Sequence, residues 1–212
     1  IEVDAEGDIV REVSYDPPQP GFDVVLDLDL RVQALLEDQL TATAEANDAP
    51  GAAAVVMDPR DGGIVAMASY PTYNPQDFVD GLSTEEYAAL TADDSGFPLS
   101  NKAISGVYAP GSTFKPVTAL AGLRAEIISP GDTIVDTGVY YVQGCTEESC
   151  RFQNAGAVPA GPVNLQTSLT VSSDYYYYRI GDNLWAQNET LGEDFLQATA
   201  REWGFDEETG ID

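Results

Sequence analysis

A serine and a lysine stand three residues apart in the segment 104–123, ISGVYAPGSTFKPVTALAGL, and their types and spacing suit nucleophilic catalysis. Ser112 follows a Pro-Gly pair, and Lys115 is one of two lysines in a 212-residue chain that has no histidine. Without histidine there is no Ser-His-Asp triad and no Cys-His pair, so a serine nucleophile would need another base, for which lysine is the obvious candidate. The alternative is that Ser112 caps a helix and Lys115 lies on the surface with its stem against the core.

The i, i+3 spacing predicts that Lys115 can serve Ser112 directly. Residues at this spacing share one face of a helix, with Cβ atoms about 5–6 Å apart. The amine accepts a proton only when it is neutral, which requires apolar burial or a nearby cation. Phe114, Pro116 and Val117 flank the lysine and are compatible with burial. A helix N-terminus at Ser112 would add a partial positive charge that favours a developing alkoxide.

A second polar group, Ser172-Ser173-Asp174, follows 60 residues after Ser112, in the segment TVSSDYYYYRIG. Read in isolation, it indicates a helix cap, because serine and aspartate favour the N-cap position. Read together with Ser112 and Lys115, it indicates a catalytic turn between two helices. The tyrosine run 175–178 is interpreted as packing and not as a ligand-stacking surface.

The elements that must position these residues follow from hydrophobic periodicity and turn residues. Residues 1–22 carry acidic residues and prolines without apolar periodicity, which predicts a linker or arm. A Pro-Arg-Asp-Gly-Gly turn predicts a hairpin, Ser83 with Glu86 predicts a capping box, and Ser112 is predicted at a helix N-terminus. The predicted strands are 23–30, the two arms of 52–69, and 133–144; the predicted helices are 31–46, 83–90, 112–126, two pieces of 163–184, and 189–205.

Composition limits the function classes. Asp and Glu number 36 against 9 Lys and Arg, and a formal charge of -27 argues against attraction to nucleic-acid phosphates or to an anionic membrane surface. Apolar stretches are far shorter than the roughly 20 residues of a membrane span and no signal peptide is visible, so the chain as written is expected to be soluble. A start at Ile1 and an end at ETGID suggest a piece of a longer protein.

The only two cysteines, Cys145 and Cys150, lie in the polar loop GCTEESC. Their separation allows a disulfide in an oxidising compartment, and two free surface thiols are the alternative. Two cysteines without histidine are too few ligands for a metal site, so no metal is expected.

The segment NKAISGVYAPGSTFKP resembles the active-site segment of class B penicillin-binding proteins, which are peptidoglycan D,D-transpeptidases. DVVLDLDLRVQ, GGIVAMASYPTYNP and GFDEETGID resemble further segments of this family, so the resemblance covers nearly the whole chain. It implies that Ser112 is the acylated nucleophile, Lys115 its base, Ser172 a proton relay, and Asp174 a partner of the lysine or of the donor peptide. It further implies substrate contacts at Gly111 and Ser173. An aspartate at 174, where many relatives have asparagine, resembles the elongation-type branch, which serves cell shape.

The resemblance implies an α/β (α+β) fold of the penicillin-binding transpeptidase and serine β-lactamase type, with an antiparallel sheet flanked by helices. Residues 23–212 would form part of this domain, incomplete at the C-terminus. The implied reaction cross-links peptidoglycan stem peptides through a serine acyl-enzyme without any cofactor, and β-lactam antibiotics would acylate the same serine. The implied setting is the extracytoplasmic side of a bacterial cell membrane, with the anchor outside this chain and a glycosyltransferase as partner.

One family motif is missing from the chain. No Lys-Thr-Gly occurs, and the Glu-Thr-Gly at 208–210 has glutamate where the lysine belongs. We therefore expect the chain to end before the strand that carries this motif and to be inactive alone as a transpeptidase. Two other functions are carried forward: a β-lactam sensor or β-lactamase of the same fold, and a catalytically silent scaffold domain.

Overall fold

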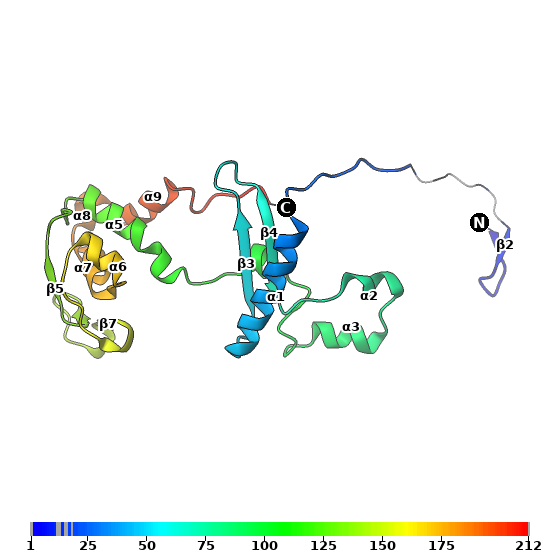
Figure 1. Ribbon diagram of the computed structural model, residues 1–212, viewed down its shortest axis with the longest axis horizontal. Coiled ribbons are helices and arrows are strands. Elements are labelled where there is room, and N and C mark those ends of the chain that lie inside the picture. Colours follow the sequence, from blue (N-terminus) through cyan, green and yellow to red (C-terminus); the bar gives the residue numbers. More distant parts are fainter. Residues whose placement is uncertain (1, 12–13, 15–16, 18, 212) are drawn as a thin grey trace. The chain divides into compact units, whose positions relative to one another are not determined.

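The computed structural model describes residues 2–11, 14, 17 and 19–211 (Figure 1). The chain divides into two compact units, Ile1–Gly106 and Val107–Asp212, and each is described by itself. This boundary differs from the one predicted from the sequence, which separates residues 1–22 from 23–212. Part of the predicted N-terminal arm, residues 1, 12–13, 15–16 and 18, lies outside the described residues; within the arm, β1 (Glu2–Val3) pairs antiparallel with β2 (Ile9–Arg11).

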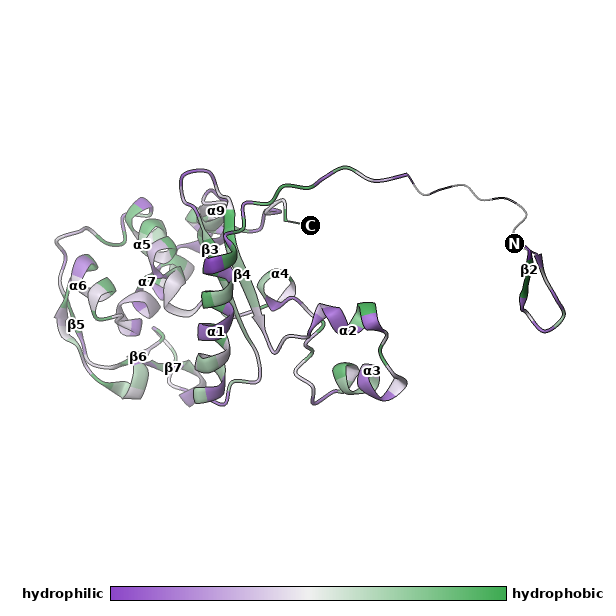
Figure 2. Cartoon of the chain, turned by 45° about the vertical axis from the view of Figure 1, so that its right-hand side comes forward, coloured by the Kyte–Doolittle hydropathy of each residue, from purple (hydrophilic) through white to green (hydrophobic). Residues whose placement is uncertain are grey.

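The first unit is built on a hairpin that packs against one helix. β3 (Ala52–Met57) and β4 (Ile64–Tyr70) pair antiparallel around the predicted turn, and α1 (Leu30–Ala46) runs alongside them (Figure 1). Asp29 caps α1 by accepting from the backbone N–H groups of Arg31 and Val32. Hydrophilic and hydrophobic residues alternate along α1 (Figure 2), as expected for a helix with one buried face. The predicted helix and hairpin are thus confirmed.

The predicted strand at 23–30 is wrong. Residues 21–29 have no regular secondary structure, and the apolar side chains among them are exposed, Val25 by 93% and Leu26 by 65%. A strand needs a partner strand to satisfy its backbone groups. Within the described residues, this segment makes one backbone bond toward the hairpin, from Asp29 N to Val65 O (2.9 Å). Alternation alone therefore did not produce a strand.

Short capped helices complete the first unit. The predicted capping box is confirmed, since Glu86 N donates to Ser83 Oγ and Ser83 N donates to Glu86 Oε2. Asn74 caps a further helix, which is absent from the helices predicted from the sequence. These helices are α2 (Pro75–Asp80), α3 (Thr84–Thr91) and α4 (Lys102–Ser105).

The second unit has a helical core. Buried residues of α5 (Lys115–Arg124) and α7 (Asp174–Ala186) form one cluster with Val163, and α9 (Phe195–Arg201) packs against α5. Tyr176 and Tyr177 belong to this cluster, which confirms the packing interpretation for those two members of the tyrosine run. The buried members are Ala119, Ala121, Val163, Tyr176, Tyr177, Ile180 and Leu184.

Two small antiparallel sheets flank these helices. The strand predicted at 133–144 is divided at Gly138, whose φ of +84° favours glycine, and its two halves pair with different partners. Cys145 and Cys150 form a disulfide in the connection between β6 and β7. The pairs are β5 (Ile134–Asp136) with β8 (Gly161–Val163), and β6 (Val139–Tyr141) with β7 (Arg151–Gln153).

The helical predictions for 163–205 hold in part. The two predicted pieces before Leu184 are α6 (Leu165–Thr170) and α7, which confirms the break between them. The single helix predicted at 189–205 is wrong, because α8 (Asn188–Leu191) ends at Gly192, whose φ is +96°. The mixture of helices and antiparallel strands confirms the predicted fold class. In the described part of the chain, no helix is both long and apolar enough to cross a bilayer.

Candidate active site

Ser112 lies in a 3-10 helix, Gly111–Phe114, that leads directly into α5 at Lys115. Gly111 has a φ of +55°, in the left-handed region that favours glycine, and this conformation turns the chain into the 3-10 helix. Pro116 stands in the first turn of α5, where a missing N–H costs nothing. Ser112 is exposed and Lys115 is buried, with 7% of its surface accessible.

The Ser172-Ser173-Asp174 turn connects α6 to α7. Ser172 has a φ of +54°, a left-handed conformation that costs a non-glycine residue roughly 1–2 kcal/mol. Ser173 is the N-cap of α7, accepting from Tyr176 N at 3.1 Å, and Asp174 is the first residue of that helix. The turn is therefore both the helix cap that the isolated pattern indicates and part of the site.

The side chains of the turn meet those of α5 in a continuous polar array. Lys115 Nζ donates to Ser172 O (2.7 Å) and to Ser172 Oγ (2.9 Å), and it forms an ion pair with Asp174 Oδ1 at 2.7 Å. Ser172 Oγ in turn donates to Ser112 Oγ (3.0 Å). Lys115 Nζ also lies 5.5 Å from the centroid of the Tyr177 ring. Four residues from two distant segments thus form one hydrogen-bonded chain that ends at the exposed Ser112 hydroxyl.

This geometry adds an intermediary between the two predicted catalytic residues. Among the hydrogen bonds of the described residues, Lys115 reaches Ser112 through Ser172, and direct proton transfer from Ser112 to Lys115 stays a prediction. The amine is drawn toward the turn, where a carbonyl, a hydroxyl and a carboxylate accept from it. The hydroxyl of Ser172 is within hydrogen-bond distance of both groups, which is what a proton relay requires.

The structure corrects the prediction for Ser173. Its side chain is buried, with 2% of the residue accessible, and its hydroxyl donates to Asp136 Oδ2 at 2.6 Å. A hydroxyl engaged inside the protein does not contact a ligand, so we reassign Ser173 from substrate binding to support of the turn. Gly111, in contrast, lines a cavity of 520 Å³ together with Ser112, Lys115 and Asp174. Val142, Phe152 and Tyr178 form an apolar part of its wall.

Sequence reasoning missed two polar residues beneath the turn. Asp136 is 1% exposed and accepts from Gly138 N (2.7 Å) and from Ser173 Oγ, and Asn154 Nδ2 donates to both of its carboxylate oxygens (2.9 and 3.0 Å). Asn154 Oδ1 accepts from Tyr175 N at 2.8 Å. The contact with Gly138 is local, but those that join Asp136 to Asn154 and Ser173 span 18 and 37 positions, so no pattern within one segment reveals them.

The hydrogen-bond donors around Asp136 determine the pKa of its carboxyl group. Burial by itself raises the pKa of Asp136, but the hydrogen bonds donated by Ser173, Asn154, Gly138 and Ala160 outweigh it, so the pKa of Asp136 lies below its ordinary value. Asp136 is thus held as a buried carboxylate. Burial also raises the pKa values of Tyr177 and Tyr178 beside the site, which keeps both phenols neutral.

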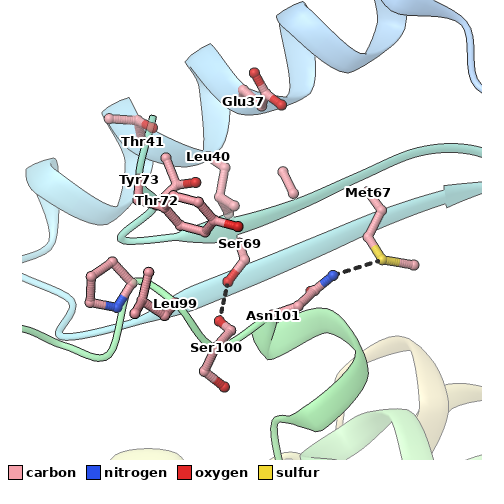
Figure 3. A pocket seen from close by; sticks show the side chains of 12 residues that line it. Glu37, Leu40, Thr41, Met67, Ser69, Thr72, Tyr73, Leu99, Ser100 and Asn101 are labelled. Carbon is pink, nitrogen blue, oxygen red and sulfur yellow. Dashed lines mark hydrogen bonds between the residues drawn. The ribbon is translucent and has the colours of Figure 1, made fainter. Parts of the chain in front are cut away.

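Other features of the described residues do not join this array. No cluster of three or more His, Cys, Asp or Glu suited to a metal gathers among them. A separate cavity of 220 Å³ lies in the first unit between α1, β4 and the segment 98–101, with Ser69 Oγ donating to Ser100 O (Figure 3). None of the site residues predicted from the sequence lines it.

Comparisons with known proteins agree with the fold and the motif. The family model of the penicillin binding protein transpeptidase domain matches residues 52–212. The chain is 35% identical over its whole length to the peptidoglycan D,D-transpeptidase MrdA of Escherichia coli strain K12, and it covers 31% of that relative. The chain therefore spans about a third of the length of this curated relative.

Solved structures of related proteins give the same picture. PBP2 of Pseudomonas aeruginosa in complex with WCK 5153 is 34% identical with a TM-score of 0.73, covering 92% of this chain and 40% of that one. Penicillin-binding protein A of Mycobacterium tuberculosis, solved as a penicillin G acyl-enzyme complex, is 27% identical with a TM-score of 0.67, covering 85% of this chain and 40% of that one.

Proposed function

Because the chain belongs to the penicillin-binding protein transpeptidase family, we propose that it carries the nucleophile and proton-transfer groups of a peptidoglycan D,D-transpeptidase that β-lactams acylate. The observation that carries the proposal is the hydrogen-bonded array from Asp174 through Lys115 and Ser172 to the exposed Ser112. Such an array supplies a nucleophile, a relay and a base in one connected chain. A relative that forms a penicillin G acyl-enzyme supports the same chemistry.

In the proposed acylation, Ser112 Oγ attacks the carbonyl carbon between the two terminal D-alanines of a stem peptide. The Ser112 proton passes to Ser172, and the Ser172 proton passes to Lys115. Lys115 can accept it only as a free amine, so the proton of its ion pair must first pass to Asp174 Oδ1, 2.7 Å away. The bond to the terminal D-alanine breaks, its nitrogen takes a proton from the array, and an ester on Ser112 remains.

The second half-reaction uses the same groups in the opposite order. An amine of a neighbouring stem peptide attacks the ester, loses a proton to the array and forms the cross-link, while Ser112 recovers its proton. The N–H of Ser112 at the start of the helical segment is suited to donate to the developing oxyanion. No cofactor enters either step.

The whole reaction needs more than the residues on this chain. The family's Lys-Thr-Gly motif does not occur in the sequence, and the substrate is a carboxylate while the chain has a formal charge of -27. We therefore expect this chain alone to lack cross-linking activity. We also propose that the protein acts on the extracytoplasmic side of a bacterial cell membrane with a glycosyltransferase as partner; the disulfide between Cys145 and Cys150 supports an oxidising compartment.

The test is the intact mass of the chain before and after incubation with benzylpenicillin. We expect one penicilloyl adduct, its loss in Ser112→Ala, and its retention in Ser129→Ala, which removes an exposed serine outside the array. An adduct that persists for hours fits a transpeptidase, whereas rapid loss with release of hydrolysed penicillin would favour a β-lactamase. A wild-type chain that remains unmodified would contradict the proposal for this chain and favour a silent scaffold.

A further inference from the structure

A buried carboxylate lies directly beneath the turn that holds Lys115. Asp136 accepts hydrogen bonds from Ser173, Asn154 and the backbone of Gly138, and its contacts in the described residues include no Lys or Arg. Burying an ionised carboxylate is costly, so a position that does so and satisfies it with neutral donors has a reason beyond simple packing.

Two of the donors to Asp136, Ser173 and Asn154, connect it to the turn and to the start of α7. Ser173 is the residue between Ser172 and Asp174, and these two neighbours supply every hydrogen-bond and ion-pair partner that the structure gives Lys115 Nζ. Asn154 bridges Asp136 to the Tyr175 N–H, one residue beyond Asp174. Asp136 and Asn154 thus hold the residues on either side of Asp174, Ser173 and Tyr175, and so fix the partners of Lys115.

The conformation of Ser172 explains why such fixing is needed. A left-handed φ of +54° is unfavourable for serine and persists only where the surrounding structure holds it. That conformation is what directs both the carbonyl and the hydroxyl of Ser172 toward Lys115 Nζ, at 2.7 and 2.9 Å. If the turn relaxed, the amine would lose two of its three partners.

We propose that Asp136 and Asn154 are positioning residues that hold the Ser172-Ser173-Asp174 turn against Lys115, and that the reactivity of Ser112 depends on them. This inference rests on the proposed function for its consequence in acylation, but the positioning itself is independent of any activity. Asp136 contacts no reacting atom. It acts through Ser173, and Asn154 acts through Asp136 and the N-terminus of α7.

The first test reads the environment of Lys115 without requiring activity. The chain has two lysines, and Lys102 belongs to the other unit, so competitive acetylation by acetic anhydride contains its own reference. Asp136→Asn replaces one carboxylate oxygen with an amide NH2 group, which cannot accept the hydrogen bonds that Ser173, Asn154 and Gly138 donate at this position. We expect the Lys115 to Lys102 labelling ratio to rise several-fold in this variant, because the amine loses its fixed partners.

A matched control separates positioning from general loosening of the unit. Tyr140→Phe removes a partly buried hydrogen bond to Asp182 Oδ2 (2.6 Å) that also connects a strand to α7, and it leaves the Asp136 contacts intact. We expect no change in its labelling ratio. An unchanged ratio in folded Asp136→Asn, or an equal rise in Tyr140→Phe, would overturn the proposal. If Asp136→Asn does not fold, Asn154→Ala removes the second bridge and is judged by the same criterion.

The second test measures acylation by benzylpenicillin over a range of concentrations. We expect the limiting rate constant to fall about 10- to 100-fold in Asp136→Asn, because small displacements of catalytic groups have effects of this size. The half-saturating concentration should stay unchanged, since Asp136 touches no ligand, and Tyr140→Phe should match the wild type. A change confined to the half-saturating concentration would contradict a positioning role. A wild-type chain that is not acylated refutes the proposed function, while the labelling ratio still decides the positioning.

Discussion

Ser172 contributes to the candidate site through both its hydroxyl and its backbone. The hydroxyl lies between Lys115 Nζ and Ser112 Oγ, and the left-handed backbone aims the carbonyl at the same amine. The two contributions can be separated because glycine adopts this backbone conformation without steric cost, whereas alanine adopts it only at a cost. Replacement of Ser172 by either residue removes the hydroxyl that lies between Lys115 and Ser112.

We predict that Ser172→Ala and Ser172→Gly both reduce benzylpenicillin acylation by at least about 100-fold, the scale of a lost proton-transfer group. The glycine variant should nevertheless be more stable than the alanine variant by about 0.5–1 kcal/mol, since relief of the left-handed strain exceeds the entropy cost of glycine. Rate measurements together with denaturant unfolding of both variants check this. Equal stability would mean that the surrounding contacts, and not the residue, carry the strain.

The buried carboxylate predicts a stability that depends on pH. The pKa of Asp136 is lowered in the folded state, whereas an unfolded aspartate has a pKa of about 3.9. Its contribution is therefore fully present above the unfolded value and is lost as the pH falls through the folded value. We expect the unfolding free energy of the wild type to exceed that of Asp136→Asn by a constant amount above about pH 5, and this difference to shrink below about pH 4.

Urea unfolding of the two proteins between pH 3 and pH 7 supplies the measurement for Asp136. Tyr140→Phe again provides the comparison, because it alters no carboxyl group buried under the turn. A wild-type advantage that grows on acidification would contradict the prediction and show that Asp136 is protonated in the folded chain.

At the scale of elements, α5 and α7 bring the two halves of the site together. Gly122 is buried in α5, and a Cβ built on it would lie 2.9 Å from Ile180 Cγ2 and 3.3 Å from Ile128 Cγ1. Ile180 is itself 1% exposed and β-branched, so it has little room to move. The close approach of α5 and α7 therefore depends on the absence of a side chain at Gly122.

We predict that Gly122→Ala destabilises the chain by about 1–3 kcal/mol, because overpacking outweighs the better helix propensity of alanine. Gly181 in α7 offers the matched control, since its added Cβ meets no atom within 4 Å and its φ is not left-handed. Gly181→Ala should stabilise by about 0.5–1 kcal/mol. Thermal unfolding followed by circular dichroism distinguishes the two, and a stabilised Gly122→Ala would show that the helices can separate at no cost.

Local patterns predicted the elements whose signals are contained within one segment. The helix at 31–46, the Ser83 capping box and the Ser112–Lys115 motif each depend on residues within a few turns of one another. The strand at 23–30 failed because pairing is not a local property. The helix at 189–205 failed at Gly192, where the backbone turns to a positive φ despite apolar periodicity.

The same distinction applies to the site. Ser172 and Asp174 were found because a family motif marks them, but their joint contact with Lys115 Nζ is a fact of folding. Asp136 and Asn154 carry no motif, and their role depends on contacts across 18 to 37 residues. Ser173 was assigned to substrate because it lies within the motif, and only its burial reveals which way it faces.

At the scale of the whole molecule, the dominant feature is charge. A formal charge of -27 on 212 residues means that carboxylates repel one another wherever the chain is compact. The ion pairs that oppose this repulsion are mostly exposed, such as Arg124 with Glu202 and Arg201 with Asp194, and exposed pairs contribute little. Net repulsion should therefore exceed net attraction at low ionic strength.

We predict that raising sodium chloride from about 20 mM to about 500 mM increases the midpoint of thermal unfolding by a few degrees, because salt screens repulsion beyond about one Debye length. The partly buried pair of Lys115 and Asp174 is screened less than the exposed charges, so the Lys115 to Lys102 labelling ratio should change little over the same range. Scanning calorimetry gives the midpoint, and an equal concentration of a neutral osmolyte corrects for nonspecific exclusion. A midpoint that falls with salt would mean that surface ion pairs, and not the excess of carboxylates, control the stability of this chain.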